Sequence, residues 1–146
     1  MLKKVSLFSV IIFLTCCNAN RTPIPDVPVR LEFSITAVAP ELFSFNGFKE
    51  FTIPQNVSQY LGYGGILVIH NIDDKYFAFD MCCPYEVRPD VRVHCNGAGI
   101  AVCDSCQSSF YVGDGNGFPT AGKAKYPLKR YSVYYDSTTA KILVTN

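Results

Sequence analysis

The chain has 146 residues, 49% of them hydrophobic, with 13 basic and 12 acidic side chains. This length and composition indicate one compact domain and argue against a disordered chain. The formal net charge of +1 argues against a general nucleic-acid-binding protein, which needs a basic face, so no nucleic-acid partner is expected. Seven cysteines are the unusual part of the composition, two near the N-terminus and five between positions 82 and 106.

The N-terminus has the features of an export signal. Two lysines precede an apolar run over residues 5–15, which is too short to span a bilayer stably and ends at Cys16 and Cys17. This pattern resembles a bacterial lipoprotein signal, so we predict a signal peptide over residues 1–16 and a lipid on Cys17. The alternatives are lipidation of Cys16, a plain cleaved signal peptide, and a retained anchor helix.

Residues 17–28 are predicted to be the lipidated cysteine and an extended tether. Three prolines in this segment exclude a helix. Removal of residues 1–16 leaves 11 basic and 12 acidic side chains, so the lipid rather than a basic patch would hold the protein on the membrane. The expected location is therefore the bacterial cell envelope, on the periplasmic or the cell-surface side, where cysteines can pair.

The folded domain is predicted to span residues 29–146 and to be all-β. Short alternating or fully apolar runs follow one another, separated by turn residues, and the pair Asn46-Gly47 is typical of a β-hairpin. No segment of the mature chain keeps a helical period over ten residues. The pattern predicts a small sandwich or barrel, with strands at residues 29–37, 48–53, 66–70, 75–80, 99–102, 109–112, 128–135 and 141–145.

The second group of cysteines carries the predicted chemistry. Cys103 and Cys106 form a Cys-x-x-Cys pair, whose spacing lets both sulfurs reach one ion. Cys95 and Cys83 (or its neighbour Cys82) could complete a set of four thiolates, which suits Zn²⁺ and also a [2Fe–2S] cluster. Alternatively, these five cysteines form two disulfides and leave one free thiol, so that no cofactor is bound.

The same region resembles the Rieske iron–sulfur domains, whose pattern is a Cys-x-His loop, a Cys-x-x-His loop about twenty residues later, and a Gly-Pro-Ala-x-x-Pro-Leu-x-x-Tyr-like segment. Cys83 and Cys103 match the two cysteine ligands of that family. The resemblance covers roughly residues 62–145 and implies a Rieske-like sandwich or barrel with two cysteine-bearing loops. Further matching positions are Pro84, Phe110, Gly122, Ala124, Pro127, Leu128 and Tyr131.

Both histidine ligands of the family are replaced, by Tyr85 at the first position and Cys106 at the second. The chain has two histidines: His70 lies in an apolar strand, and His94 lies outside the family's ligand pattern. The usual two-His, two-Cys centre therefore cannot be built. The resemblance favours iron, while a count of four thiolates alone favours zinc.

Two functions follow from these patterns. The first is an electron-transfer or metal-binding module without catalytic residues, which passes electrons to a protein partner through a centre held by cysteines. Its candidate ligands are Cys83, Cys95, Cys103 and Cys106. The second is a cofactor-free structural or interaction domain of an envelope assembly, stapled by disulfides.

Overall fold

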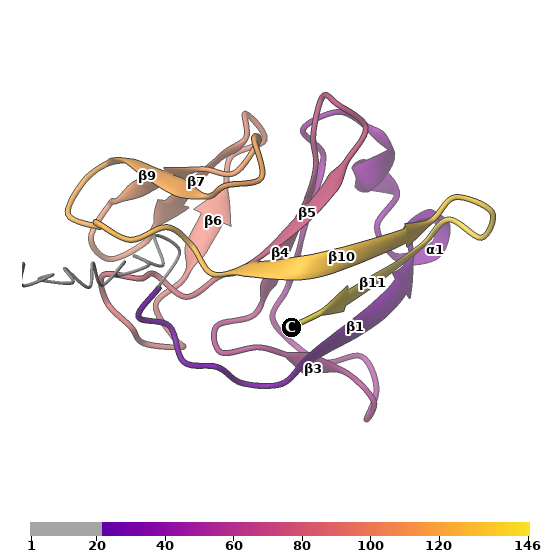
Figure 1. The fold of residues 1–146 in the computed structure, drawn as a ribbon, viewed down its shortest axis with the longest axis horizontal. Helices are drawn as coiled ribbons and strands as arrows, with labels where there is room; N and C mark the ends of the chain where they lie inside the picture. Colours follow the sequence, from indigo (N-terminus) through magenta and orange to yellow (C-terminus); the bar gives the residue numbers. More distant parts are fainter. Residues whose placement is uncertain (1–21) are drawn as a thin grey trace, which may run out of the picture.

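The computed structural model describes residues 22–146, which form two antiparallel sheets (Figure 1). The predicted signal peptide and the candidate lipidation sites Cys16 and Cys17 lie outside the described residues. Within residues 22–146, no helix is long and apolar enough to cross a membrane. The elements are β1 (Val29–Ser34), α1 (Ile35–Val38), the 3₁₀ turn η1 (Pro40–Phe43), β2 (Phe48–Phe51), β3 (Tyr60–Leu61), β4 (Ile66–His70), β5 (Tyr76–Asp80), β6 (Val93–Cys95), β7 (Ile100–Cys103), β8 (Ser109–Tyr111), β9 (Phe118–Ala121), β10 (Arg130–Asp136) and β11 (Lys141–Thr145).

The larger sheet curls around the first hydrophobic core. Its seven strands follow the order β2-β4-β5-β10-β11-β1-β3. Phe33 of β1 and Phe51 of β2 nevertheless meet, with ring centroids 4.7 Å apart, although four strands separate β1 from β2 in the sheet. Alternate residues along β1, β4 and β11 point into this core, as period-2 patterning requires.

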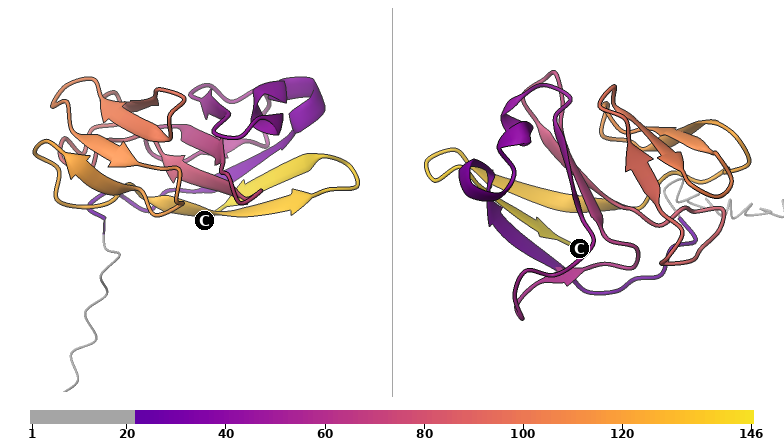
Figure 2. Two further views of the ribbon diagram at one scale, coloured as in Figure 1. Left: turned by 90° about the horizontal axis from the view of Figure 1, so that it is seen from above. Right: turned by 180° about the vertical axis from the view of Figure 1, so that it is seen from behind.

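The smaller sheet, in the order β6-β7-β8-β9, covers the opposite side of β4 and β5. Figure 2 shows it as a separate layer beside the larger sheet. All five residues of β4 are buried because Ile66 and Val68 enter the first core, while Leu67 and Ile69 enter the second. Burial on both faces explains why this strand is continuously apolar rather than alternating.

Most predicted strands are confirmed, and two local predictions are wrong. The strand predicted at residues 29–37 ends at Ser34, where a single helical turn, α1, follows. The hairpin predicted at Asn46-Gly47 is absent, because η1 precedes this turn and β2 pairs with β4. Asn46 does have a positive φ of 60°, so the turn preference is real although no strand precedes it.

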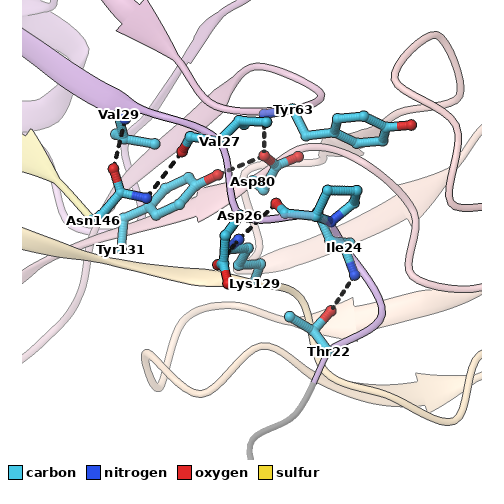
Figure 3. Close-up of polar contacts among 11 residues, drawn as sticks. Thr22, Ile24, Asp26, Val27, Val29, Tyr63, Asp80, Lys129, Tyr131 and Asn146 are labelled. Atoms are coloured by element: carbon cyan, nitrogen blue, oxygen red, sulfur yellow. Dashed lines mark hydrogen bonds and ion pairs between the residues drawn. The ribbon is translucent and has the colours of Figure 1, made fainter.

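The described part of the predicted tether is fastened to the domain. We call residues 22–28 the N-terminal strap. Its Ile24 side chain is buried, and Lys129 at the start of β10 donates to the Pro25 carbonyl at 2.7 Å and pairs with Asp26. The C-terminal residue Asn146 donates to the Val27 carbonyl at 2.9 Å (Figure 3). The strap is therefore extended, as the prolines predict, and it belongs to the domain's surface.

A fully buried carboxylate, Asp80 at the end of β5, joins four parts of the chain. One oxygen accepts hydrogen bonds from the N–H groups of Gly64 and Cys82, at 2.9 and 2.7 Å. The other accepts from the Tyr63 N–H at 2.8 Å and from the Tyr131 hydroxyl at 2.6 Å, as Figure 3 shows. These bonds satisfy the buried charge without a basic partner.

We expect Asp80→Asn to destabilise the metal-free, reduced protein by roughly 3 kcal/mol or more. The side-chain nitrogen of asparagine is a donor, so it would face donors that have lost the carboxylate oxygen as their acceptor. Urea unfolding at constant m-value measures this loss. Asp90→Asn is the control, since Asp90 pairs with Arg88 on the exposed surface, where the loss of an ion pair changes the stability far less. A loss at Asp80 no larger than at Asp90 would contradict the assignment.

Candidate metal centre

Three cysteine sulfurs converge between the two predicted loops. Cys83 follows the isolated bridge between Cys82 and Arg92, Cys103 ends β7, and Cys106 lies in the turn that leads to β8. The Sγ atoms of Cys83, Cys103 and Cys106 all lie within 4.8 Å of one another, and those of Cys83 and Cys106 are 3.7 Å apart. Among the described residues, this is the one group of three or more potential metal ligands that close together.

Both loops use the same backbone turn to present their first cysteine. The carbonyl of Cys83 accepts from the Val87 N–H at 2.9 Å, and the carbonyl of Cys103 accepts from the Gln107 N–H at 3.1 Å. Val87 and Gln107 both adopt the left-handed conformation, with φ of 53° and 58°. This conformation is costly for a β-branched residue such as Val87. The loops are thus held by backbone geometry and by the strands that flank them.

Ser108 controls the charge state of Cys106. Its buried hydroxyl oxygen accepts from the N–H groups of Lys123 and Ala124, at 2.9 and 3.0 Å, so its own proton is directed at the Cys106 sulfur, 3.1 Å away. Burial raises the pKa of Cys106, but the hydrogen bonds from Ser108 and the neighbouring thiols outweigh it, and the pKa lies below its usual value. Cys106 is also the partly exposed member of the trio.

Cys83 has the opposite character. It is fully buried, and burial raises its pKa to about 12, although the N–H groups of Glu86 and Tyr85 favour its thiolate. Those same N–H groups would stabilise a metal-bound sulfur, because a coordinated thiolate keeps most of its negative charge. A metal ion that binds here must displace a proton from Cys83, so its affinity increases with pH.

The remaining candidates lie outside this group. Cys95 ends β6, where its N–H donates to the Glu50 carboxylate at 3.0 Å, and it is not among the three converging thiols. The Cys82 thiol donates to the Arg88 carbonyl at 3.3 Å. Tyr85 is half-exposed, with the Lys123 ammonium 5.9 Å from its ring centre. The nitrogens of His94 contact the carboxylates of Glu50 and Asp104.

The number of converging thiols, rather than their spacing, distinguishes one ion from a two-iron cluster with four protein ligands. Two sulfurs each about 2.3 Å from one ion are about 3.8 Å apart at the tetrahedral angle, and those of Cys83 and Cys106 are 3.7 Å apart. A [2Fe–2S] cluster takes four protein ligands, whereas three thiols converge here. The described residues therefore do not fit the family's cluster in its usual form.

The same distance bears on the disulfide prediction. None of the five cysteines of the described domain is disulfide-bonded. The Cys83 and Cys106 sulfurs, at 3.7 Å, are well beyond the bond length of about 2.05 Å. Sequence reasoning did not identify Ser108, although a hydroxyl two residues after a candidate ligand is a usable signal for a hydrogen bond to that ligand.

Neither a protein-family model nor a curated protein sequence matches the chain. Among solved structures, a chain from a complex of reduced oxygenase and oxidized ferredoxin in carbazole 1,9a-dioxygenase is similar, with a TM-score of 0.50 and 12% identity over 80% of this chain and 93% of that chain. The ferredoxin of carbazole 1,9a-dioxygenase from Nocardioides aromaticivorans IC177 gives 0.48 and 20% over 82% and 97%. The first likeness confirms the predicted all-β, Rieske-like fold.

In the metal-free, reduced protein, we expect iodoacetamide at neutral pH to alkylate Cys106 before the other four domain cysteines. Its pKa is lowered and its sulfur is partly exposed, whereas burial raises the pKa of Cys82 and Cys83 to about 12. Peptide mass spectrometry measures the rate at each site.

Ser108→Ala should raise the pKa of Cys106, move the midpoint of its alkylation-rate profile to higher pH and slow the reaction at neutral pH several-fold. The rate should recover at high pH, which separates this effect from general unfolding. The exposed Ser105→Ala is the matched control. Equal rates at Cys106 and Cys83 would contradict the assigned charge states.

Proposed function

We propose that this protein is a lipid-anchored domain of the bacterial cell envelope that binds one iron ion through Cys83, Cys103 and Cys106 and transfers electrons to a protein partner. The convergence of these three sulfurs within 4.8 Å is the observation that carries the proposal. Thiolates are soft ligands that suit iron and zinc. The Rieske-like fold favours iron, because electron transfer is the function that the sequence resemblance implies.

The ion would supply the change in oxidation state, and the chain supplies its environment. Cys83 and Cys103 are fully buried, which keeps water from two of the three sulfurs. Cys106 is partly exposed and provides the shortest route from the centre to a docked partner. The Ser108 hydroxyl and the N–H groups of Tyr85 and Glu86 stabilise the negative charge on the sulfurs and so tune the reduction potential.

The half-exposed Tyr85 stands where the fold family has its first histidine ligand. Because only three thiols converge, a fourth coordination position on the ion would be open to the Tyr85 phenol oxygen, to a water molecule or to a group from the partner. A site with three protein ligands and an open position is typical of metals that take part in reactions, whereas structural sites are closed by four ligands.

The cofactor-free alternative is supported by a specific distance. Because the Cys83 and Cys106 sulfurs are 3.7 Å apart, an oxidant of the envelope could join them with a small movement of the partly exposed Cys106 loop. In that form the domain would keep its fold and act by binding other envelope proteins. Counting free thiols in the unfolded, unreduced protein distinguishes the two functions. A form with this single disulfide has three domain thiols, the two-disulfide form predicted from the sequence has one, and the metal-binding form has five.

We expect anaerobically purified protein to contain one iron per chain without acid-labile sulfide. Cys83→Ser, Cys103→Ser and Cys106→Ser should each lower metal affinity by more than the factor of about 10–100 that loss of an outer contact costs. Cys95→Ser should leave the affinity unchanged. Elemental analysis, sulfide assay and visible spectra measure these results.

Two irons with two sulfides would contradict the single-ion site and support the [2Fe–2S] cluster. One zinc would retain the site but contradict electron transfer. Loss of metal in Cys95→Ser would show that the fourth predicted cysteine is a ligand after all. Colourless, metal-free protein with a Cys83–Cys106 disulfide would favour the structural alternative.

A further inference from the structure

We propose that the face of the domain around Thr22, Phe118 and Tyr126 lies against the surface of an anionic lipid bilayer. We call this face the membrane face. The proposal rests on the lipid anchor of the proposed function but not on its metal. It is carried by the attachment of the N-terminal strap, by the short length of chain that precedes it, and by the side chains exposed around it.

The strap fixes where the chain leaves the domain. Ile24 is buried, Lys129 holds Pro25 and Asp26, and Asn146 holds both Val27 and Val29. The hydrogen bonds join the strap and the first residue of β1 to Lys129, which precedes β10, and to the C-terminal residue, and Figure 3 shows them along the strap. These contacts therefore restrict rotation of the domain about residue 28, where the sequence predicts the end of the tether.

Little chain remains between this attachment and the predicted lipid. Residues 18–21 separate Cys17 from Thr22. Fully extended, the five Cα–Cα steps from Cys17 to Thr22 span at most about 18 Å. A lipid inserted at Cys17 thus keeps Thr22 close to the headgroups, so whatever surrounds Thr22 must also lie near the bilayer.

The surroundings of Thr22 suit a bilayer interface. Thr22 and Ile24 line a concavity of about 680 Å³ together with Asn116, Phe118 and Pro127. The Leu128 N–H donates to the Gly117 carbonyl at 3.0 Å, and this bond holds the segment that contains Pro127 beside the start of β9. Phe118 is 50% exposed and Tyr126, next to Pro127, is 52% exposed. Aromatic rings at such positions are typical of the membrane–water interface.

The charge of this face complements anionic headgroups. The segment over residues 123–130 has four basic side chains and no acidic one. Lys129 is neutralised by Asp26, whereas Lys123, Lys125 and Arg130 are exposed residues. Of these, Lys123 lies over the Tyr85 ring and Arg130 over the Phe77 ring, so Lys125 has no such contact within the described residues. Each basic side chain near an anionic bilayer contributes about 1 kcal/mol. This contribution is small beside that of the lipid, and it selects the orientation of an already tethered domain.

In this orientation the thiolate site lies near the membrane face. The N–H groups of Lys123 and Ala124 donate to Ser108, whose hydroxyl contacts Cys106. Three residues further along, Pro127 lines the same concavity as Thr22. The segment from Lys123 to Pro127 thus connects the site to the membrane face, so a partner of the site must bind close to the bilayer.

Because the chain has no tryptophan, a single introduced tryptophan reports on its own position. Phe118→Trp tests the membrane face, and Tyr134→Trp, 63% exposed near the β10–β11 turn at the other end of the domain, is the control (Figure 1). The full-length, lipidated protein is reconstituted into vesicles of phosphatidylcholine and phosphatidylglycerol that contain acyl chains brominated near the headgroup. We expect quenching several-fold stronger for Phe118→Trp than for Tyr134→Trp.

Equal quenching at the two positions, or none at Phe118→Trp, would overturn the proposal. Tyr126→Trp provides a second reporter if Phe118→Trp does not fold. Lys125→Gln should weaken the quenching at Phe118→Trp in these vesicles, and no change would overturn the role of charge. A mass spectrum without lipid on Cys17 would overturn the membrane face and the anchor together. Metal content, measured on the same samples, reports separately on the thiolate site.

Discussion

The buried charge of Asp80 is the constraint on which the site depends. A carboxylate with no exposed surface is tolerated only when its lone pairs are filled, and here three backbone N–H groups and one tyrosine hydroxyl fill them. Those donors come from the turn before β4, from the residue before the first cysteine ligand, and from β10. The same interaction therefore ties β10 and the turn before β4 to the end of β5, next to the residue at which the Cys83 loop begins. The thiolate site needs no metal to be placed, because this hydrogen-bond network and the two matching turns already hold its loops.

A fixed loop framework explains how the ligand set can differ from that of the fold family. The imidazole of a histidine carries its ligand atom several bonds beyond Cβ, whereas cysteine carries its sulfur directly on Cβ. With the backbone held, Cys106 must place its donor nearer to the loop, and its sulfur lies 3.7 Å from that of Cys83. Tyr85 is half-exposed and is not a member of the converging group.

The sequence could predict those features that local patterns determine. β4 and β11 appear at their predicted bounds, because a fully apolar run and a strict alternation each match the burial of one strand. The sulfurs of the Cys103-x-x-Cys106 pair lie within 4.8 Å of each other, and their binding of one ion stays a prediction. By contrast, spacing along the chain could not reveal that Cys95 lies apart from the other thiols, since this depends on the pairing of β6 with β7. The Asn46-Gly47 turn exists without its hairpin, because β2 gains more by pairing with the doubly buried β4 than with the segment just before it.

In the proposed single-iron centre, the electrostatics of the site would favour a low reduction potential. Three thiolates neutralise a trivalent iron ion but leave one negative charge with a divalent ion, and a buried charge of this kind is costly in a medium of low dielectric constant. Asp80 adds to that cost, since its charge, after burial, raises the pKa of the adjacent Cys82 thiol. The Ser108 hydroxyl and the N–H groups at Tyr85 and Glu86 act in the opposite direction by stabilising negative sulfur. Imidazole ligands would have added no negative charge. In that proposed centre, the replacement of both histidines would lower the potential, because neutral ligands are removed and an anionic one is added, and the hydrogen-bond donors would act against that change.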